Sequence, residues 1–256
     1  MIFQPNALAE RTVLITGASG GIGTVTARAL ADCGATVLAQ HRKHDAELRA
    51  ALDGVPADRA VLLQADLSTP DQARKLWRRA SEVREIDTLV LNAAVMPETP
   101  VDGPDDLWDA GWQEAMQVNV IAAGALLREA VRAFAARGSG TAIVLSSWAA
   151  EQGSRIKDVS AYAASKAAIR NLAQTFARNY ARDGVRVHML APGVVRAGMG
   201  TAGLDDARLA SVAEGLAMGR HVSPDEIAQI AVFLAADACP SLTGATLDVN
   251  GASYIR

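Results

Sequence analysis

The chain has 256 residues, of which 50% are hydrophobic but only 4% aromatic, so its core has to be built mainly from Ala, Val, Leu and Ile. A formal net charge of −3 and a pI near 5.8 provide no long-range attraction for nucleic acid or an anionic membrane. No apolar run reaches the roughly 18 residues of a membrane span. The N-terminus lacks the order of a secretory signal, and Cys33 and Cys239 match no metal-ligand spacing. We therefore expect a cytoplasmic protein without nucleic-acid, membrane or metal partners.

Short apolar runs alternate with helical patterns along the whole chain. Strands are predicted at Val13–Thr16, Thr36–Gln40, Ala60–Gln64, Thr88–Leu91, Ala142–Ser146, Val185–Leu190 and Ala245–Val249. Helices are predicted at Gly23–Asp32, Asp45–Ala51, Pro70–Glu82, Trp108–Arg137, Ser160–Arg182 and Pro224–Ala236. Most strand runs are continuous rather than alternating, which is typical of strands buried on both faces of a parallel sheet. We predict an α/β fold: one domain over residues 1–256 with a doubly wound parallel sheet between two layers of helices.

Several element ends are marked by their residue types. Gly34 and Gly138 follow helical patterns, where a left-handed residue caps the helix. Ser223 and Pro224, followed by two acidic residues, have the pattern of a helix start. The segment from about Pro192 to Val222 has little periodicity, and a long loop in a compact domain is usually functional. We predict that residues 193–222 form a lid over a substrate.

The first strand ends in the sequence TGASGGIG, in which Gly17, Gly21 and Gly23 lead into a helix. Glycines allow a sharp turn and a close approach of the backbone to a ligand, and the helix N-terminus presents amides to a phosphate. Turns use glycine and serine in any case, so a flexible turn is the alternative. The position after the first strand favours nucleotide binding.

Polar residues also follow the third and fourth predicted strands. Asp66 could accept a hydrogen bond from an adenine amino group, although a turn or capping aspartate is an equally ordinary explanation. Asn92, Ala93 and Ala94 follow the fourth strand, where a backbone wall against an adenosine is expected. All of these positions lie at carboxyl ends of strands, where open α/β sheets bind ligands.

The sequence YAASK places Tyr162 and Lys166 one helical turn apart on the same face. A nearby cation lowers the pKa of a phenol and makes it an acid–base group, whereas a surface Tyr/Lys pair is the alternative. Ser146 and Ser147 end the fifth predicted strand, from which a hydroxyl could reach the tyrosine. Asn119 lies inside a long apolar helical pattern, either as a satisfied core amide or as a group that positions a water against Lys166.

Together these segments resemble the compact, single-domain branch of the short-chain dehydrogenase/reductase family. The resemblance rests on TGASGGIG, ADL, LNAA, Asn119, IVLSS, YAASK, LAPG and LTGATLDVNG, which occur in the family's order along nearly the whole chain. It implies a Rossmann sheet of seven parallel strands and hydride transfer between NAD(P)(H) and a carbonyl/alcohol pair.

The resemblance also implies roles for individual residues. Tyr162 is expected to donate and accept the proton, and Lys166 to bind the nicotinamide ribose and lower the pKa of the tyrosine. Ser147, the second of the serine pair, is expected to hold the substrate oxygen, and Asn119 to support the proton relay. The expected cofactor contacts are Gly17, Ser19, Gly21, Ile22, Gly23, Arg42, Asp66, Leu67, Asn92, Ala93, Ala94, Tyr162, Lys166, Pro192, Gly193 and Val195.

The chain departs from the family pattern at three places outside the catalytic set. Ala94 stands where the family has glycine and could narrow the space near the cofactor. Ala197 stands where the family often has a threonine that contacts the nicotinamide, so backbone groups such as those of Val195 would have to suffice. Gly251 and Ala252 replace a pair of glycines, which we expect to matter little.

The sequence LAQHRKH follows the second predicted strand, where the adenosine ribose of a dinucleotide would lie. NAD users generally carry an acidic residue there, but this chain has His41 followed by Arg42. A guanidinium can bind a 2′-phosphate with charge-assisted hydrogen bonds, although Ser19 and Gly20 provide no second basic residue. We predict a preference for NADP(H), with NAD(H) possible.

The expected substrate is a small carbonyl or alcohol compound of the ketone, 3-oxoacyl or sugar type. Its pocket could have an apolar wall from Trp148, Met96, Met199 and Met218, and an anion could be attracted by Arg155, Lys157 and Arg196. Solvated loop charges and gap-filling methionines are the alternatives. Other functions left open are an epimerase or dehydratase on the same fold and a nucleotide-sensing protein without catalysis.

By resemblance, the chain is expected to form a homotetramer, or a homodimer, through the helices at Trp108–Arg137 and Ser160–Arg182. Both patterns contain alanine-rich faces that permit close helix approach; packing within one chain is the alternative. These faces contain Ala163, Ala164, Ala167, Ala168 and the region Ala122–Ala125.

Overall fold

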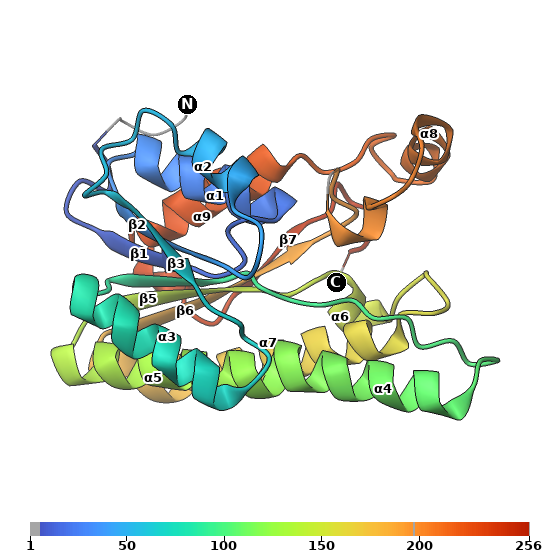
Figure 1. Cartoon of the computed structure of the whole chain (residues 1–256), viewed down its shortest axis with the longest axis horizontal. Coiled ribbons are helices and arrows are strands. Elements are labelled where there is room, and N and C mark those ends of the chain that lie inside the picture. Colours follow the sequence, from blue (N-terminus) through green and yellow to red (C-terminus); the bar gives the residue numbers. More distant parts are fainter. Residues whose placement is uncertain (1–5, 197, 256) are drawn as a thin grey trace.

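The structure is a computed structural model and describes residues 6–196 and 198–255. Its centre is one parallel sheet of seven strands in the order β3-β2-β1-β4-β5-β6-β7 (Figure 1). The strands are β1 (Thr12–Ile15), β2 (Thr36–His41), β3 (Ala60–Gln64), β4 (Thr88–Leu91), β5 (Gly140–Leu145), β6 (Val185–Pro192) and β7 (Thr246–Val249). The predicted doubly wound α/β fold is therefore confirmed, with its change of winding direction between β1 and β4.

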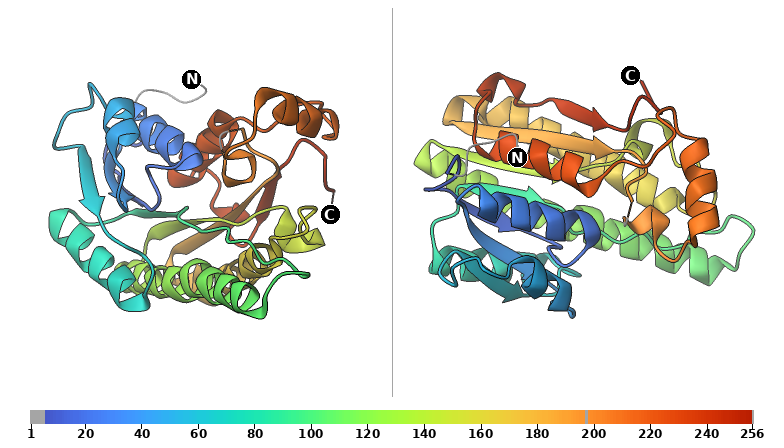
Figure 2. Two further views of the ribbon diagram at one scale, coloured as in Figure 1. Left: turned by 45° about the vertical axis from the view of Figure 1, so that its right-hand side comes forward. Right: turned by 90° about the horizontal axis from the view of Figure 1, so that it is seen from above.

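Helices cover both faces of the sheet, with α1, α2 and α9 on one face and α3, α4, α5 and α7 on the other (Figures 1 and 2). The α-helices are α1 (Gly21–Asp32), α2 (Ala46–Ala51), α3 (Pro70–Val83), α4 (Asp105–Met116), α5 (Ala123–Arg137), α6 (Ala149–Gln152), α7 (Ser160–Tyr180), α8 (Asp206–Glu214) and α9 (Pro224–Ala235). A π-helix, η1 (Gln117–Ala122), joins α4 to α5, and 3-10 turns form η2 (Ala181–Asp183), η3 (Met199–Thr201) and η4 (Pro240–Leu242). No helix in the described part of the chain combines the length and apolar character needed to cross a membrane.

Alternate strand residues point into two separate cores. Val13 and Ile15 of β1 are buried under α1 and α9, whereas Leu14 between them belongs to the core under α3, α5 and α7. In that second core Trp77 of α3 meets Phe134 of α5 edge-on, with ring centroids 6.0 Å apart. Continuous apolar strands follow directly from this arrangement, because both faces of the sheet are covered.

Element ends follow local sequence signals. Gly138 ends α5 in the left-handed conformation with φ 80°, and Gly34 has φ 97° after α1. At the start of α9, the Ser223 hydroxyl accepts from the Asp225 amide and the Glu226 carboxylate accepts from the Ser223 amide, so the predicted helix start is confirmed.

Two predicted elements differ from the structure. The helix expected over Trp108–Arg137 begins earlier, at Asp105, and η1 interrupts its α-helical hydrogen bonding around Asn119. The segment expected to be irregular over Pro192–Val222 contains η3 and α8, and α6 was not predicted at all. Both short α-helices have few apolar residues in periodic positions, so the pattern along the chain did not reveal them.

The predicted lid segment is closed at its base. The amide of Arg196 donates to the Val222 carbonyl at 3.0 Å, and the Val222 amide donates to the Val194 carbonyl at 2.9 Å. Between these ends the chain passes through η3 and α8, which lies at the carboxyl end of the sheet beside the C-terminal segment (Figure 2).

Candidate active site

The glycine turn between β1 and α1 is a tight backbone cradle. Gly17 has φ 63°, a conformation that favours glycine. A Cβ on Gly23 would lie 2.1 Å from the Gly17 carbonyl oxygen, so only glycine allows α1 to begin this close to the turn. Gly21 is the first residue of α1, whose N-terminal amides therefore open toward the turn. This cradle, which a side chain would fill, fits a dinucleotide pyrophosphate.

Side chains from neighbouring strands hold the turn in place. The Asn92 amide group donates to the carbonyls of Thr16 and Gly17, both at 3.0 Å. The Thr16 hydroxyl oxygen accepts from the backbone amides of Asn92 and Ala93. Gln40 of β2 accepts from the Gly17 amide at 2.8 Å and donates to the Ala65 carbonyl at 2.7 Å. Asn92 was expected here. Thr16 and Gln40 stand in the segments TGASGGIG and LAQHRKH, but their role was missed because a local motif does not show hydrogen bonds to distant strands.

The expected adenosine contacts lie at the ends of β2 and β3. Asp66 is exposed, and one of its carboxylate oxygens accepts from the Ser68 amide, so it forms the ordinary turn that was the alternative. Leu67 is partly buried and packs against the core beneath α3 and α5. Arg42 is exposed at the end of β2, and His41 beside it is 7% exposed with a ring Nδ1 that has no partner in the described part of the chain.

Tyr162 and Lys166 lie on one face of α7, as predicted. Lys166 is 4% exposed, its Nζ donates to the Leu145 carbonyl at 2.7 Å, and it lies 5.7 Å from the centroid of the Tyr162 ring. Burial lowers the pKa of Lys166 to about 8.

Burial raises the pKa of Tyr162 above its ordinary value, and a hydrogen bond with the Ser147 side chain lowers it by a smaller amount. Desolvation therefore has a larger effect on the pKa of Tyr162 than the Ser147 side chain has. That Lys166 lowers this pKa stays a prediction.

The two serines after β5 have different surroundings. The Ser146 hydroxyl donates to the Lys166 carbonyl at 3.2 Å, which ties β5 to α7. The Ser147 hydroxyl faces Tyr162 and accepts from the Ala149 amide at 3.2 Å. Of the pair, Ser147 is therefore the one that shares a site with the tyrosine.

Asn119 is a buried strut, with its side chain satisfied by protein groups. Its amide nitrogen donates to the Val95 carbonyl at 2.8 Å and to the Ser165 hydroxyl at 2.9 Å, and its oxygen accepts from the Val95 amide at 2.8 Å. The hydrogen bonding of the helix changes at its backbone carbonyl, because the Ala123 amide donates to the carbonyls of Val118 and Val120 and not to that of Asn119.

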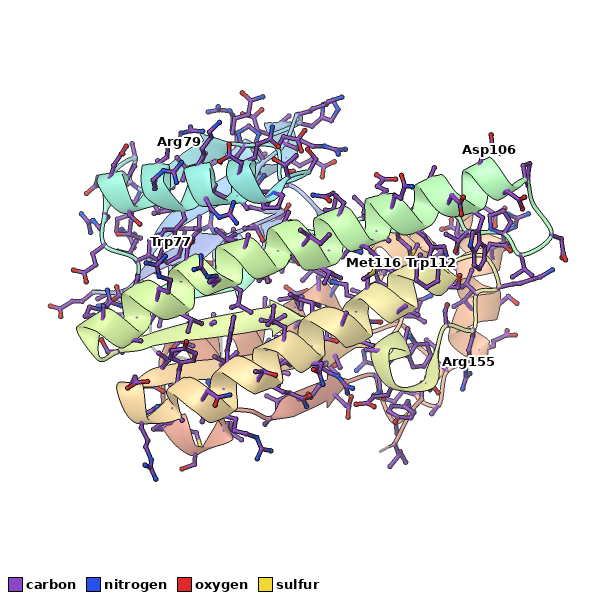
Figure 3. All side chains as sticks on the ribbon, turned by 90° about the horizontal axis from the view of Figure 1, so that it is seen from below. Trp77, Arg79, Asp106, Trp112, Met116 and Arg155 are labelled. Atoms are coloured by element: carbon purple, nitrogen blue, oxygen red, sulfur yellow. The ribbon has the colours of Figure 1, made fainter. Side chains whose placement is uncertain are left out.

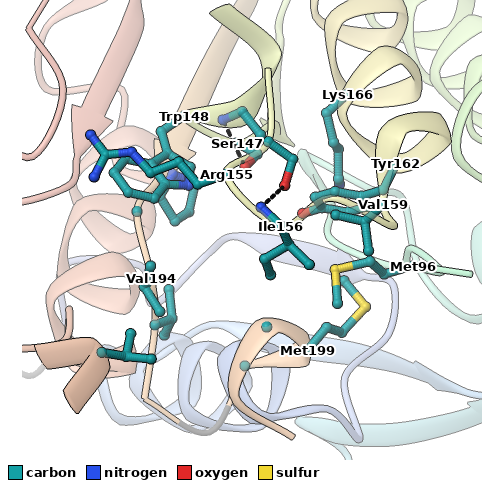
Figure 4. A pocket seen from close by; sticks show the side chains of 18 of the residues that line it. Met96, Ser147, Trp148, Arg155, Ile156, Val159, Tyr162, Lys166, Val194 and Met199 are labelled. Atoms are coloured by element: carbon teal, nitrogen blue, oxygen red, sulfur yellow. Dashed lines mark hydrogen bonds between the residues drawn. The ribbon is translucent and has the colours of Figure 1, made fainter. Parts of the chain in front are cut away.

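A cavity of about 380 Å³ joins the cradle to the Ser/Tyr/Lys centre (Figure 4). Ile22, Asn92, Pro192, Gly193 and Val195 line it on the side of the glycine turn and β6. On the other side its walls are mainly apolar: Met96, Ile156, Val159, Met199, Val212 and Leu216. Val212 and Leu216 come from the lid segment and were not predicted as pocket residues. Two apolar residues four positions apart are too few to indicate a helix in the sequence.

Four of the predicted pocket residues do line the cavity: Met96, Trp148, Arg155 and Met199. Met218 is not part of the wall and packs against Gly251, where a Cβ would lie 2.8 Å from its sulfur. Lys157 forms an ion pair with Asp102, and Arg196 is exposed outside the cavity.

The three departures from the family pattern have different outcomes. Ala94 is half-buried beside the turn. Ala197 lies outside the described residues. Ala252 adopts φ 60°, a left-handed conformation that costs a residue with a Cβ about 1–2 kcal/mol, so this replacement of glycine is strained.

Sheet, cradle and cavity together define a class of protein: a Rossmann-type nucleotide-binding fold with an acid–base centre at the carboxyl edge of its sheet. Comparisons with known proteins agree with this. The family described as enoyl-(acyl carrier protein) reductase matches residues 17–252. Cis-4-hydroxycyclohexanecarboxylate dehydrogenase of Sinomonas cyclohexanicum is 34% identical over 249 residues, covering 96% of this chain and 97% of that protein.

Two solved structures are similar over nearly their full length. One is described as an NAD(P)-dependent gluconate 5-dehydrogenase from Beutenbergia cavernae with bound NADP; it is 35% identical with a TM-score of 0.85 and covers 98% of this chain and 99% of its own. The other is 3-oxoacyl-(acyl-carrier-protein) reductase from Agrobacterium tumefaciens with NADP bound. It is 30% identical with a TM-score of 0.85, and the match covers 98% of this chain and 99% of that one.

The chain belongs to the short-chain dehydrogenase/reductase family. It is an oxidoreductase that acts on CH–OH groups.

Proposed function

We propose that this protein is an NADP(H)-dependent oxidoreductase that interconverts a carbonyl and an alcohol on a small ketone, 3-oxoacyl or sugar-type substrate. Asn119, Ser147, Tyr162 and Lys166 form its catalytic set. The observation that carries the proposal is that Ser147, Tyr162 and Lys166 line one cavity, which reaches the glycine cradle. The nicotinamide cofactor, when bound, supplies or accepts the hydride.

The side chains of the cavity manage the proton. In the reducing direction the Tyr162 hydroxyl donates its proton to the substrate oxygen while Ser147 hydrogen-bonds the same oxygen. The raised pKa of Tyr162 keeps the phenol protonated for this step. Lys166, with a pKa of about 8, stabilises the phenolate that remains. The backbone carbonyl of Asn119, to which the Ala123 amide does not donate, would accept from a water that returns the proton.

Cofactor contacts are proposed along the cradle. Gly17, Ser19, Gly21, Ile22 and Gly23 would hold the pyrophosphate side, and Asp66, Leu67, Asn92, Ala93 and Ala94 the adenosine side. Pro192, Gly193 and Val195 would hold the nicotinamide with Tyr162 and Lys166. Support comes from the backbone approach that Gly23 permits and from the shared cavity wall.

The decisive test is Tyr162→Phe, measured with a panel of ketones, keto acids, sugars and acyl thioesters and with both NADPH and NADH. We expect kcat/KM to fall by at least about 100-fold because the proton donor is lost, while the Kd for cofactor stays within a few fold. Unchanged activity would contradict the catalytic set. In the wild-type protein, cofactor binding without turnover of any substrate in the panel would instead favour the nucleotide-sensing alternative. Product formation by the wild type without net cofactor oxidation would favour an epimerase or dehydratase.

Preference for NADP(H) is assigned to Arg42, which is exposed beside the buried His41 with no acidic residue at this strand end. A charge-assisted hydrogen bond is worth about 1.5–3 kcal/mol. Arg42→Ala is therefore expected to lower the NADPH/NADH ratio of kcat/KM by about 10-fold or more. Lys43 is the neighbouring basic residue and is also exposed. Lys43→Ala is therefore the matched control and should leave the NADPH/NADH ratio of kcat/KM nearly unchanged. An unaltered ratio in Arg42→Ala would remove Arg42 from this role, leaving NAD(H) as the alternative cofactor.

We also propose that residues 1–256 act as one domain with residues 193–222 as its lid, and that the enzyme is a cytoplasmic homotetramer or homodimer. Cys33 is buried and Cys239 exposed, both as free thiols, which suits a reducing compartment. Within one chain Ala122 and Ala125 are already buried against the core, whereas Ala164 of α7 is exposed and available to a second copy.

A further inference from the structure

The cavity has a second polar feature apart from its acid–base centre. Of the described residues that line it, Lys166 and Arg155 are basic and none is acidic. Lys166 is buried beneath Tyr162, whereas Arg155 is exposed on the loop after α6. Figure 4 shows Arg155 beside Trp148, with Ser147 between this pair and Tyr162. A substrate seated at Tyr162 therefore extends along apolar walls toward a cation at the rim.

The Arg155 guanidinium is held in a way that leaves its hydrogen-bond donors free. Its central carbon lies over the Trp148 ring at 5.4 Å from the ring centroid, within the range of a cation–π interaction. This attraction uses no N–H group, so the guanidinium donors stay available for a carboxylate.

No carboxylate in the part of the chain that the structure describes pairs with these donors. Within residues 6–196 and 198–255, the structure gives the Arg155 side chain no ion pair or hydrogen bond with an acidic residue. Lys157, two positions along the same loop, is neutralised by Asp102. Within this part of the chain, Arg155 is thus a cation at the cavity that has no acidic partner and can receive a ligand.

We propose that Arg155 binds a carboxylate of the substrate, so that the enzyme acts on carbonyl or alcohol compounds with an apolar body and a terminal carboxylate. This inference rests on the proposed oxidoreductase function and names its substrate class. One guanidinium matches a single negative charge in a bidentate pair. Met96, Val159 and Leu216 suit a hydrocarbon body rather than a polyhydroxylated one. Trp148 and Arg155 are specificity-determining residues.

The test uses two ligands of the same shape, cyclohexanecarboxylate and cyclohexanecarboxamide, titrated calorimetrically into the full-length enzyme with and without NADP⁺. We expect the carboxylate to bind at least about 10-fold more tightly than the amide, because a hydrogen-bonded ion pair is worth more than one with a neutral group. Arg155→Met keeps the aliphatic stem on Trp148 and removes the charge, so it should abolish this preference. Arg155→Lys should retain part of it, since it keeps the charge without the planar fork.

Lys157→Met is the matched control, because it removes a cation of the same loop that does not line the cavity; it should keep the full preference. Equal binding of the two ligands by the wild-type protein, absence of carboxylate binding at millimolar concentration, or an undiminished preference in Arg155→Met would overturn the inference. Failure of the proposed function looks different: carboxylate binding would still depend on Arg155, but no keto acid would oxidise NADPH or NADH.

Discussion

Burial of Lys166 makes the stability of the protein depend on pH in a definite direction. Its pKa is lowered from 10.5 to about 8 in the folded protein because the ammonium group is desolvated. Below about pH 8 both the folded and the unfolded chain carry the proton, and the folded state bears the full cost of the buried charge. Between about pH 8 and 10.5 the unfolded chain binds the proton that the folded chain has released, so the free energy of unfolding rises with pH.

Lys166→Met provides the test of this linkage. Without cofactor, the free energy of unfolding of the wild type relative to Lys166→Met is expected to increase by up to about 1.4 kcal/mol per pH unit above about pH 8. Urea unfolding at several pH values below 10, where the titration of Tyr162 does not interfere, measures this difference. A constant difference across that range would show that the folded-state pKa of Lys166 is not lowered.

Single residues were the easiest part of the site to predict when a motif carried them. Tyr162, Lys166, Asn92 and the glycines of the turn lie where their motifs place them, because each motif defines a short stretch of backbone. Thr16 and Gln40 escaped prediction, since their role is to accept or donate hydrogen bonds across strands far apart in the sequence. No pattern along the chain encodes that contact.

At the scale of elements, the start of α1 depends on one glycine. A Cβ at Gly23 would meet the Gly17 carbonyl oxygen at 2.1 Å and the Asn92 side chain at 2.8 Å, and both belong to the framework of the cradle. Gly20 in the same turn has φ −96°, and a Cβ there would find its nearest neighbour at 3.6 Å. The two glycines therefore differ in how strictly the fold requires them.

Gly23→Ala is expected to lower the free energy of unfolding by about 2 kcal/mol or more, because the helix has to move away from the turn. Gly20→Ala should change it by less than about 0.5 kcal/mol. Chemical denaturation measures the free energy of unfolding of both variants. It is done without cofactor, so that any effect of the added methyl group on cofactor binding does not contribute. Equal stability of the two variants would mean that the turn relaxes around the added methyl group.

The helix expected over Trp108–Arg137 illustrates how far an element can be predicted. Its apolar periodicity is continuous, so the sequence pattern indicates one helix. The structure inserts η1 at Gln117–Ala122, where the Asn119 side chain bonds to Val95 and Ser165 from other segments. A π-helix of this kind depends on hydrogen-bond partners that the tertiary fold brings close. The apolar periodicity of the sequence does not indicate those partners.

At the scale of the whole molecule, exposed apolar residues lie on the long helical rod of α4, η1 and α5. Figure 3 shows this rod beside α7 on one face of the molecule. Leu107 is 44% exposed and Ile121 of η1 is 50% exposed. Covering such residues with a second copy of the chain would bury apolar surface, which supports the proposed oligomer.

Ile121→Arg is expected to dissociate the oligomer into smaller particles, because a charge would be buried without a partner at the interface. Light scattering coupled to size exclusion measures the mass. Ile255→Arg serves as the control, since Ile255 is 78% exposed and lies near the C-terminus, outside α4, η1 and α5. A wild-type protein that runs as a monomer at working concentration would contradict the oligomer.

The sequence alone was enough to predict the succession of strands and helices along the chain, the family and the candidate residues of an acid–base centre. Apolar periodicity and short motifs describe the local backbone, and parallel strands bring their carboxyl ends to one edge. Only the tertiary structure decided which groups meet there: that Ser147 rather than Ser146 faces Tyr162, that Lys157 is neutralised by Asp102, and that Arg155 lies over the Trp148 ring. These outcomes depend on packing between segments that are distant in the sequence. The chemistry of a side chain is set by its burial and by the charges around it, and its residue type alone does not reveal either.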